Sequence, residues 1–196
     1  MSAAGQQDQV VDPVGTVNVF DPHPLNWLFI TWNTMEEPIR TDHEGYITMA
    51  LAESVRPEGR VITYEIVERH METARGNIER SGLMPYVDMR LGDVTEGIPE
   101  EDLDAVVLDM ATPWLVVPHA WAALAGSGVF LSFSPTIEQV MKTAEALKAH
   151  PFIEIETVEL LMRNITVAPN KTRPQTVMIG HSGYLTTARK VLRLMD

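Results

Sequence analysis

The chain has 196 residues, 45% of them hydrophobic, and this length and composition predict one globular domain of ordinary size. It contains no cysteine, which excludes disulfides, thiolate metal sites and cysteine nucleophiles, and its six histidines lack helical metal-ligand spacing, so we expect no metal site. Its formal charge of −12 repels nucleic acid at long range, so any contact with RNA requires a local basic patch.

The N-terminal part of the chain predicts little regular structure before a first strand. Residues 1 to about 24 are rich in Gly, Gln, Asp and Pro and predict a loose arm. They lack the basic start and apolar core of a secretory signal, and no apolar run is long enough for a bilayer, so we expect a cytoplasmic protein without membrane contact. The run LNWLFITW, residues 25–32, predicts a buried strand, and the polar stretch 33–45 predicts a loop.

Between residues 46 and 150 the patterns of helix and strand alternate. The expected helices are 46–55, 68–82, 116–128 and 136–150, and the expected strands are 60–65, 87–93, 103–110 and 128–135. The last helix begins with a capping box from Thr136 to Gln139, and the helix at 116–128 is expected to stop at glycine. Such alternation is typical of a doubly wound, parallel α/β sheet.

The last part of the chain breaks this rhythm. Residues 152–161 and 175–191 predict two strands with no helix between them, the second interrupted near Gly180 to Gly183. We therefore expect an antiparallel hairpin at one edge of a mostly parallel sheet. The chain would divide into a divergent, partly loose N-terminal segment, residues 1–40, and an α/β domain, residues 41–196.

Three acidic residues stand at the ends of predicted strands: Glu65, Asp93 and Asp109. In doubly wound sheets ligands bind at the carboxyl ends of the strands. Glu65 also lies twenty residues after Gly45, the separation at which an acid can hydrogen-bond a ribose hydroxyl. These acids indicate a nucleotide-type cofactor site, and the alternative is that strand ends are simply polar.

The stretch VVLDMATPW is more specific, because a carboxylate follows a buried strand and a Pro-Trp pair comes soon after. Asp109, Pro113 and Trp114 would form a rigid, aromatic-walled loop that suits a flat ring held beside a negative charge. In the alternative interpretation, Trp114 only covers the edge of the sheet.

Five stretches of the chain carry a resemblance to a known family. They are ITMALAESVRPEGRVITYE, GDVTEGIPEEDLDAVVLDMATPW, SFSPTIEQV, RNITVAPNKTRPQ and MIGHSGYLTTARKV. From Glu44 to Val191 the chain resembles the tRNA (adenine-N1)-methyltransferases, which are Rossmann-like enzymes that use S-adenosylmethionine to modify an adenine in the T-loop. The resemblance implies a Rossmann-like methyltransferase fold, this cofactor and a tRNA substrate.

The resemblance also implies roles for single residues. The resemblance implies that Asp109, at the acid of the family's Asp-x-Pro-x-Pro-Trp pattern, is the catalytic residue. A carboxylate there can accept the exocyclic N–H of adenine and so orient N1 toward the methyl group. The expected cofactor-binding residues are Gly45, Glu65, Gly92, Asp93 and Asp109, and the expected substrate-binding residues are Trp114, Arg163, Arg173 and His181.

The chain departs from the family at three places. Relatives carry a glycine-rich loop before the first helix, where this chain has Asp42, His43, Glu44 and only one glycine. The family's Asp-x-Pro-x-Pro-Trp pattern lacks its first proline, because Ala111 stands there. About forty residues at the N-terminus have no counterpart in the family. We expect the altered loop to be looser than a glycine turn, with the side chains of His43 and Glu44 near the cofactor.

These departures leave three hypotheses open. The chain could be an active tRNA adenine-N1 methyltransferase, a non-catalytic methyltransferase-like subunit that supports tRNA binding by an active partner, or a rearranged product without activity. The expected partners are tRNA and either further copies of the chain, as a tetramer by resemblance, or an active subunit in a hetero-oligomer.

Overall fold

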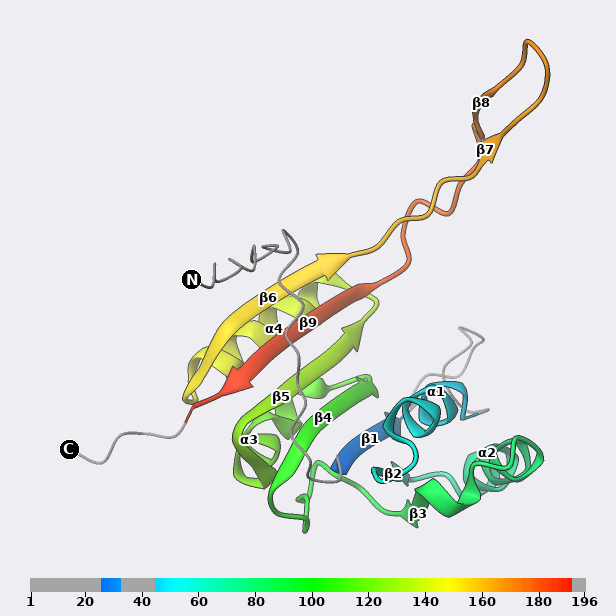
Figure 1. Cartoon of the computed structure of the whole chain (residues 1–196). Helices are drawn as coiled ribbons and strands as arrows, with labels where there is room; N and C mark the ends of the chain where they lie inside the picture. The colour runs from blue at the N-terminus through cyan, green and yellow to red at the C-terminus, as the bar shows by residue number, and fades with distance from the viewer. Residues whose placement is uncertain (1–25, 33–44, 192–196) are drawn as a thin grey trace, which may run out of the picture.

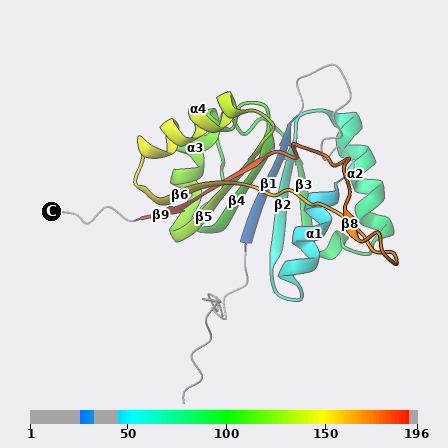
Figure 2. The same ribbon diagram turned by 90° about the horizontal axis from the view of Figure 1, so that it is seen from above.

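The computed structural model of the protein describes residues 26–32 and 45–191, which form an α/β sheet with helices on both faces (Figures 1 and 2). The strands are β1 (Asn26–Trp32), β2 (Arg60–Glu65), β3 (Val87–Leu91), β4 (Leu103–Met110), β5 (Leu124–Ser134), β6 (Phe152–Glu159), β7 (Ile165–Thr166), β8 (Arg173–Pro174) and β9 (Tyr184–Lys190), and the α-helices are α1 (Tyr46–Val55), α2 (Glu68–Arg80), α3 (Pro113–Ala123) and α4 (Ile137–Lys148). None of these described helices is long and apolar enough to cross a membrane.

The main sheet has seven strands in the order β3-β2-β1-β4-β5-β9-β6. The first five strands of this order are parallel, whereas β9 is antiparallel to both of its neighbours, β5 and β6. This confirms the mostly parallel sheet with an antiparallel C-terminal hairpin at one edge. It also confirms the strand predicted at residues 25–32, since β1 lies in the middle of the sheet.

The predictions for the loose N-terminal arm and for the altered loop at Asp42 to Glu44 lie outside the described residues. The division of the chain at residue 40 stays a prediction. Strand β1, which precedes that division, nevertheless pairs with β2 on one side and β4 on the other.

The sheet buries two hydrophobic cores. One core lies against α1 and α2, and its buried residues include Val61, Val107 and Ile78. The other lies against α3 and α4 and includes Val106 and Leu108. Because successive side chains of a strand point to opposite faces, β4 contributes to both cores. The nearly all-apolar pattern of this strand therefore predicted its burial correctly.

The helix predicted at residues 116–128 is wrong at both ends. Helix α3 begins three residues earlier, at Pro113, because proline is well suited to the first turn of a helix. It ends at Ala123, and β5 begins at the next residue. The strand expected from residue 128 therefore begins four residues earlier. An added Cβ at Gly128, which lies in this strand as expected, would be 3.0 Å from the carbonyl oxygen of Leu103.

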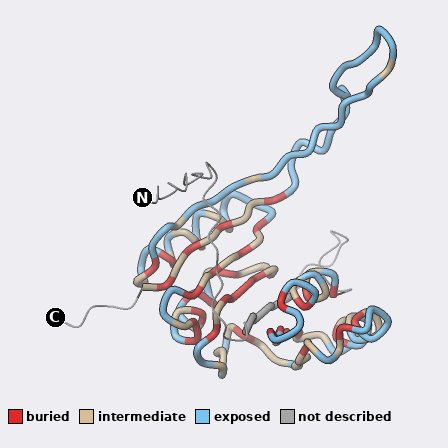
Figure 3. Tube along the Cα trace, in the orientation of Figure 1, coloured by how far each residue is buried: buried red, intermediate tan, exposed pale blue. Residues whose placement is uncertain are grey.

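Residues 160–183 form an arm that extends from the sheet between β6 and β9 (Figure 1). Its outer part is a short hairpin of β7 and β8, and nearly all of its residues are exposed (Figure 3). The predicted strands at 152–161 and 175–191 are therefore too long, because β6 ends at Glu159 and β9 begins at Tyr184. Beyond those residues the chain leaves its neighbouring strands.

Gly183 closes the base of the arm, and we expect its replacement by alanine to destabilise the fold. Its φ is +130°, and an added Cβ would lie 2.2 Å from Cε2 of Phe133. Backbone strain of this kind costs about 2 kcal/mol, so thermal unfolding of Gly183→Ala should show a clear loss of stability. Gly180→Ala is the matched control, because an added Cβ there meets no atom within 4 Å. Equal melting temperatures for the two variants would contradict the prediction.

Candidate active site

Glu65 and Asp109 stand level with each other at the carboxyl ends of β2 and β4, the two strands that flank β1. Asp109 of β4 pairs with Thr31 of β1, and Ile30 of the same strand pairs with Tyr64, the residue before Glu65. Neighbouring strands lie about 4.8 Å apart, so the Cα atoms of the two acids are roughly 10 Å apart. Both acids are at the carboxyl ends of parallel strands, as the sequence predicts.

This place is also the switch point of the sheet topology. From β1 the chain proceeds through α1 to β2 and β3 on one side, and it then returns to β4 on the other side of β1. Ligands of doubly wound sheets bind outside the carboxyl ends of the strands at such a point. The topology therefore places the two carboxylates where a bound ligand is expected.

The two side chains also share a face of the sheet. Thr63 lies two residues before Glu65, and Thr48 of α1 donates to the Thr63 hydroxyl oxygen across 3.4 Å. Val107 lies two residues before Asp109 and belongs to the core against α1 and α2. Because side chains alternate along a strand, Glu65 and Asp109 both lie on the side of α1 and α2.

The Glu65 carboxylate is held in place by the chain that follows it. The residue is buried, and its Oε1 accepts a hydrogen bond of 2.9 Å from the backbone N–H of Val67. This contact fixes the direction of a negative group at the end of β2. A fixed carboxylate of this kind can accept hydrogen bonds from a pair of hydroxyl groups.

The Asp109 carboxyl group is partly removed from solvent at the end of β4. Burial raises its pKa from 3.8 to about 6. Among residues 45–191, no hydrogen bond or ion pair joins its carboxylate to another group. A desolvated carboxylate without a partner favours a ligand that brings an N–H donor or developing positive charge.

Asp93 lies two residues beyond the end of β3, in the loop that follows this strand. Its Oδ1 accepts hydrogen bonds from the backbone N–H of Thr95, at 2.8 Å, and from the Thr95 hydroxyl, at 2.6 Å. The preceding residue, Gly92, donates its N–H to the carbonyl oxygen of Glu65 at 3.0 Å. An added Cβ at Gly92 would contact the ring of Tyr64 at 3.4 Å, so the chain passes close to this ring.

Arg90 braces the loop that contains Asp93. From β3 its guanidinium donates to Asp88 at 2.8 Å, to the Tyr64 hydroxyl at 3.1 Å and to Glu100 at the far end of the loop. Tyr64 in turn donates to Glu100 at 2.8 Å. The two strands β2 and β3 therefore hold both ends of the loop.

The loop after Asp109 leads directly into helix α3. Pro113 is buried in the first turn of the helix, and Trp114 follows it half-buried. The ammonium group of Lys142, on α4, lies 4.6 Å from the centroid of the Trp114 ring. Trp114 is thus close in sequence to Asp109, and it also contacts a cation on the neighbouring helix.

Gly45 lies at the N-terminus of α1 and has a φ of +77°, which favours glycine. An added Cβ would lie 3.2 Å from Cβ of Ala74, so α1 and α2 approach closely at this point. The structure therefore explains the glycine through packing. Its expected contact with the cofactor stays a prediction.

The arm leaves the sheet at the same end of the strands as the carboxylates. Asp109 pairs with Phe133 of β5, and the next residue of β5, Ser134, pairs with Tyr184. Tyr184 also pairs with Glu159, the last residue before the arm. The base of the arm is therefore one residue beyond the level of Asp109 and two to three strands away, or roughly 10 to 15 Å.

His181 lies at the base of the arm. Its Nδ1 is 2.6 Å from Oε1 of Glu159, and its Nε2 is 2.8 Å from the carbonyl oxygen of Pro135. The carbonyl of Pro135 and the carboxylate of Glu159 raise the pKa of His181, because the imidazolium form donates to both. The residue thereby ties the arm to the junction between β5 and α4. Its expected role in binding substrate stays a prediction.

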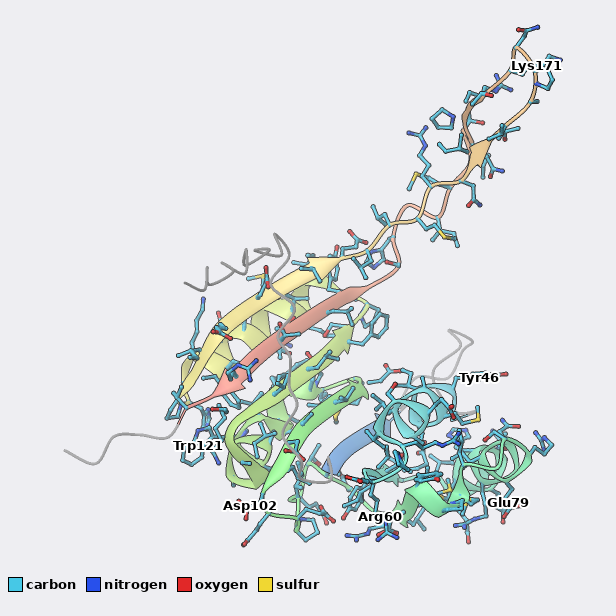
Figure 4. All side chains as sticks on the ribbon, viewed as in Figure 1. Tyr46, Arg60, Glu79, Asp102, Trp121 and Lys171 are labelled. Carbon is cyan, nitrogen blue, oxygen red and sulfur yellow. The ribbon has the colours of Figure 1, made fainter. Side chains whose placement is uncertain are left out.

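Arg163 and Arg173 lie on the arm and are exposed, away from the three carboxylates. The Nε of Arg163 donates to the carbonyl oxygen of Gln175 at 3.3 Å, across the two sides of the arm. Lys171 stands near the tip (Figure 4). Residues 160–183 contain these three cations and no Asp or Glu, which leaves a charge of −15 for the rest of a chain of −12.

Three residues, Lys142 and Gln139 beside the loop after Asp109 and Lys171 on the arm, were given no functional role from the sequence. The signal for Lys171 was available, since the arm contains no acid to balance its cations. Lys142 and Gln139 carry no such signal, because their partners Trp114 and Ala111 are 28 residues away in the sequence.

Comparison with known proteins gives the same family by two routes. A family described as the tRNA methyltransferase complex GCD14 subunit matches residues 42–172. The chain is 37% identical over 171 residues to tRNA (adenine(57)-N(1)/adenine(58)-N(1))-methyltransferase TrmI of Methanocaldococcus jannaschii, covering 74% of this chain and 61% of that protein. It is 34% identical over 125 residues to the tRNA (adenine(58)-N(1))-methyltransferase catalytic subunit trmt61a of Dictyostelium discoideum, covering 61% and 40%. The chain thus spans less than two thirds of the length of either relative.

Two solved structures share the fold. A SAM-dependent O-methyltransferase from Thermotoga maritima gives a TM-score of 0.78 at 32% identity and covers 89% of this chain and 62% of that one. The tRNA (m1A58) methyltransferase TrmI from Aquifex aeolicus gives 0.71 at 25% identity and covers 86% and 64%. The Rossmann-like methyltransferase fold expected from the sequence is therefore confirmed.

Proposed function

Because the chain belongs to the family described as the tRNA methyltransferase complex GCD14 subunit, we propose that it transfers a methyl group from S-adenosylmethionine to N1 of an adenine in the T-loop of tRNA. The observation that carries this proposal is the level pair of acids, the buried Glu65 and the half-buried Asp109, at the switch point of the sheet. The names of the relatives, which include tRNA adenine-N1 methyltransferases, support the reaction.

The residues at this edge fit S-adenosylmethionine by their chemistry. Glu65 is a buried, fixed acceptor that suits the two ribose hydroxyls. Asp93 is held in the next loop and suits the adenine of the cofactor, with Gly92 allowing a close approach. Asp109 has no partner among residues 45–191, so it suits a cationic or N–H-donating group.

Bound S-adenosylmethionine would supply an electrophilic methyl group on its sulfonium. The chain's own part is to align the target base and to exclude water. The ionised Asp109 accepts a hydrogen bond from the exocyclic amine of the adenine and thereby directs N1 toward the methyl group. It also stabilises the positive charge that develops on the base. Trp114, five residues after Asp109 in the sequence, would give the base an aromatic surface once the base has left its stack in the T-loop.

The state of Asp109 favours catalysis over a supporting role in an oligomer. Keeping a desolvated carboxyl group without a partner among residues 45–191 is unfavourable for folding, and such sites are commonly functional. The relative from Dictyostelium is also named a catalytic subunit. We therefore prefer the active methyltransferase to the non-catalytic subunit.

Calorimetry and a transfer assay on the full chain test this function. S-adenosylmethionine should bind the purified chain, and an unmodified tRNA transcript should acquire 1-methyladenosine, identified by mass spectrometry after digestion. In Glu65→Gln the amide oxygen still accepts from Val67, but the charge is lost, so cofactor affinity should fall about tenfold. Glu68→Gln, at an exposed position of α2, is the control and should bind like wild type. Absence of both cofactor binding and methyl transfer would refute the proposal.

We propose further that the arm provides the basic patch that an acidic chain requires for contact with tRNA. Arg163 and Arg173, which the sequence assigned to substrate binding, belong to it together with Lys171. The support is their exposure and the absence of acids from residues 160–183.

The arm also supports the expected oligomer. It exposes large apolar side chains, namely Leu160, Leu161, Met162, Ile165, Val167, Val177, Met178 and Ile179. Exposed apolar patches of this kind mark interaction surfaces, and a second copy of the chain offers an identical surface. Light scattering that returned the mass of one copy, 21.9 kDa, would contradict this assembly. The cytoplasmic location stays a prediction.

A further inference from the structure

Both the oxygen and the nitrogen of the Gln139 side-chain amide make hydrogen bonds. Its Oε1 accepts from the backbone N–H of Thr136, at 3.2 Å, and from the Thr136 hydroxyl, at 2.9 Å. Its backbone N–H donates to Oγ1 of Thr136, which completes the capping box of α4. At the other end, Nε2 donates a hydrogen bond of 2.9 Å to the carbonyl oxygen of Ala111.

The capping box does not need this second contact. A glutamate at the same position would accept the same hydrogen bonds, since capping boxes use Glu or Gln equally. Only an amide can also donate to Ala111. The nitrogen of Gln139 therefore serves the loop between β4 and α3 rather than its own helix.

This loop has little internal support of its own. Thr112, the N-cap residue of α3, makes no side-chain hydrogen bond to the helix. Ala111 lies two residues after Asp109 and three before Trp114, so its carbonyl is in the middle of the segment that carries both. Gln139 fixes this segment from outside.

A second residue of α4 contacts the end of the same segment. Lys142 is three residues after Gln139, on the same side of the helix, and its ammonium lies over the ring of Trp114. One side of α4 thus contacts the loop at Ala111 and at Trp114. The two contacts together define where the loop runs relative to the sheet.

We propose that Gln139 is a positioning residue for methyl transfer, because it sets the loop that joins Asp109, near the end of β4, to Trp114, in the first turn of α3, and hence the alignment of the target base. This inference rests on the proposed function and adds to it a residue outside the expected site. Alignment errors of about 1 Å can cost up to a hundredfold in rate, so a single lost contact of this kind has a measurable effect.

Two reciprocal variants separate the loop contact from the cap. Gln139→Glu keeps the acceptor for Thr136 and adds a negative charge at the N-terminus of a helix, which is favourable, but it cannot donate to Ala111. Thr136→Ala removes the hydroxyl of the capping box and leaves the amide of Gln139 free to donate. We expect kcat to fall about tenfold in Gln139→Glu with an unchanged Tm and an unchanged KM for the cofactor. We expect Thr136→Ala to lower Tm and to keep kcat within about twofold of wild type.

Hydrogen exchange gives a readout that does not depend on activity. Backbone amides of residues 110–112, 114 and 115 should exchange about tenfold faster in Gln139→Glu than in wild type or in Thr136→Ala. If wild type transfers no methyl group, the proposed function fails, and the exchange rates still decide the role of Gln139. Gln139→Met, which has a similar shape and no donor, gives the same comparison if the glutamate variant does not fold. Wild-type exchange and wild-type kcat in the donor-free variant, or equal loosening in Thr136→Ala, would overturn the proposal.

Discussion

Replacing Asp109 with asparagine should lower the rate of methyl transfer at least about a hundredfold and raise the free energy of unfolding at pH 7 by about 3 kcal/mol. The two effects have one cause. Burial raises the pKa of this carboxyl group from 3.8 to about 6, so the folded chain holds an unfavourable charge at pH 7. Asparagine removes that charge, and with it the acceptor that would orient the adenine. Loss of activity with a gain in stability is the expected sign of a site residue.

The pH dependence follows from the same shift. The pKa of Asp109 is higher in the folded state than in the unfolded state. At any pH between 3.8 and about 6, the folded chain therefore keeps the Asp109 proton while the unfolded chain has mostly lost it. The contribution of Asp109 to stability is therefore greatest below pH 3.8, decreases as the pH rises and is lost above about pH 6. The stability gain of Asp109→Asn should be absent near pH 4, and the wild-type rate should rise through an apparent pKa of about 6.

Glu101→Gln is the matched control for this variant, since it removes one negative charge from an exposed residue near the opposite end of β4. It should change neither the rate nor the stability measurably. Chemical unfolding at pH 4 and pH 7, together with pH–rate profiles, supplies the measurements. An Asp109→Asn enzyme with wild-type turnover would remove Asp109 from the mechanism.

Neutralising the three cations of the arm should weaken tRNA binding about a hundredfold at 0.1 M salt. Three phosphate contacts would be lost, and each costs roughly tenfold or less in affinity. The variant replaces Arg163, Lys171 and Arg173 with glutamine. The slope of log binding constant against log salt should become shallower by about 3, one unit for each contact. Filter binding or fluorescence anisotropy over a salt series measures both quantities.

The control for the arm variant is a second triple variant that removes three positive charges from helix α2 instead of the arm. Arg69, Arg75 and Arg80, all on α2, are replaced with glutamine. Affinity for tRNA should stay within a few-fold of wild type, and cofactor affinity should be unchanged in both triple variants. If the two triple variants lose affinity equally, net charge and not the arm governs binding to RNA.

The sequence predicted those parts of the fold that depend on local patterns. The period-two and helical patterns from residue 46 onward identified β2, β3, β4 and α4, and the capping box at Thr136 fixed the start of α4. The helical pattern of residues 116–128 failed after Ala123, because residues 124–127 belong to β5. In the same strand, Gly128 lies close to the carbonyl oxygen of Leu103 in β4, a neighbour that only the folded sheet supplies.

Part of the candidate site could likewise be predicted from local patterns, and part could not. Parallel strands bring their carboxyl ends to one edge, so the strand pattern alone predicts that Glu65 and Asp109 lie together. Other features of the site depend on register and packing. They are the level positions of the two acids across β1, the lack of a partner for Asp109 within residues 45–191, and the hydrogen bond from Gln139 to Ala111. No local pattern encodes such contacts. The roles of the site residues stay proposals.

Within the part of the chain that the structure describes, charge is separated between the arm and the body formed by the remaining residues, which makes this part an electric dipole. The described residues outside the arm hold 19 Asp or Glu and 10 Lys or Arg, a net charge of −9, and the three cations stand on an extended segment that leaves one corner of the sheet (Figure 1). In the field of a polyanion such a dipole rotates before contact, so productive encounters begin at the arm while the body is repelled. The arm joins the sheet at the carboxyl ends of the strands, where Glu65 and Asp109 lie, so an encounter oriented in this way would bring tRNA, the proposed substrate, to that end of the sheet and not to the opposite one.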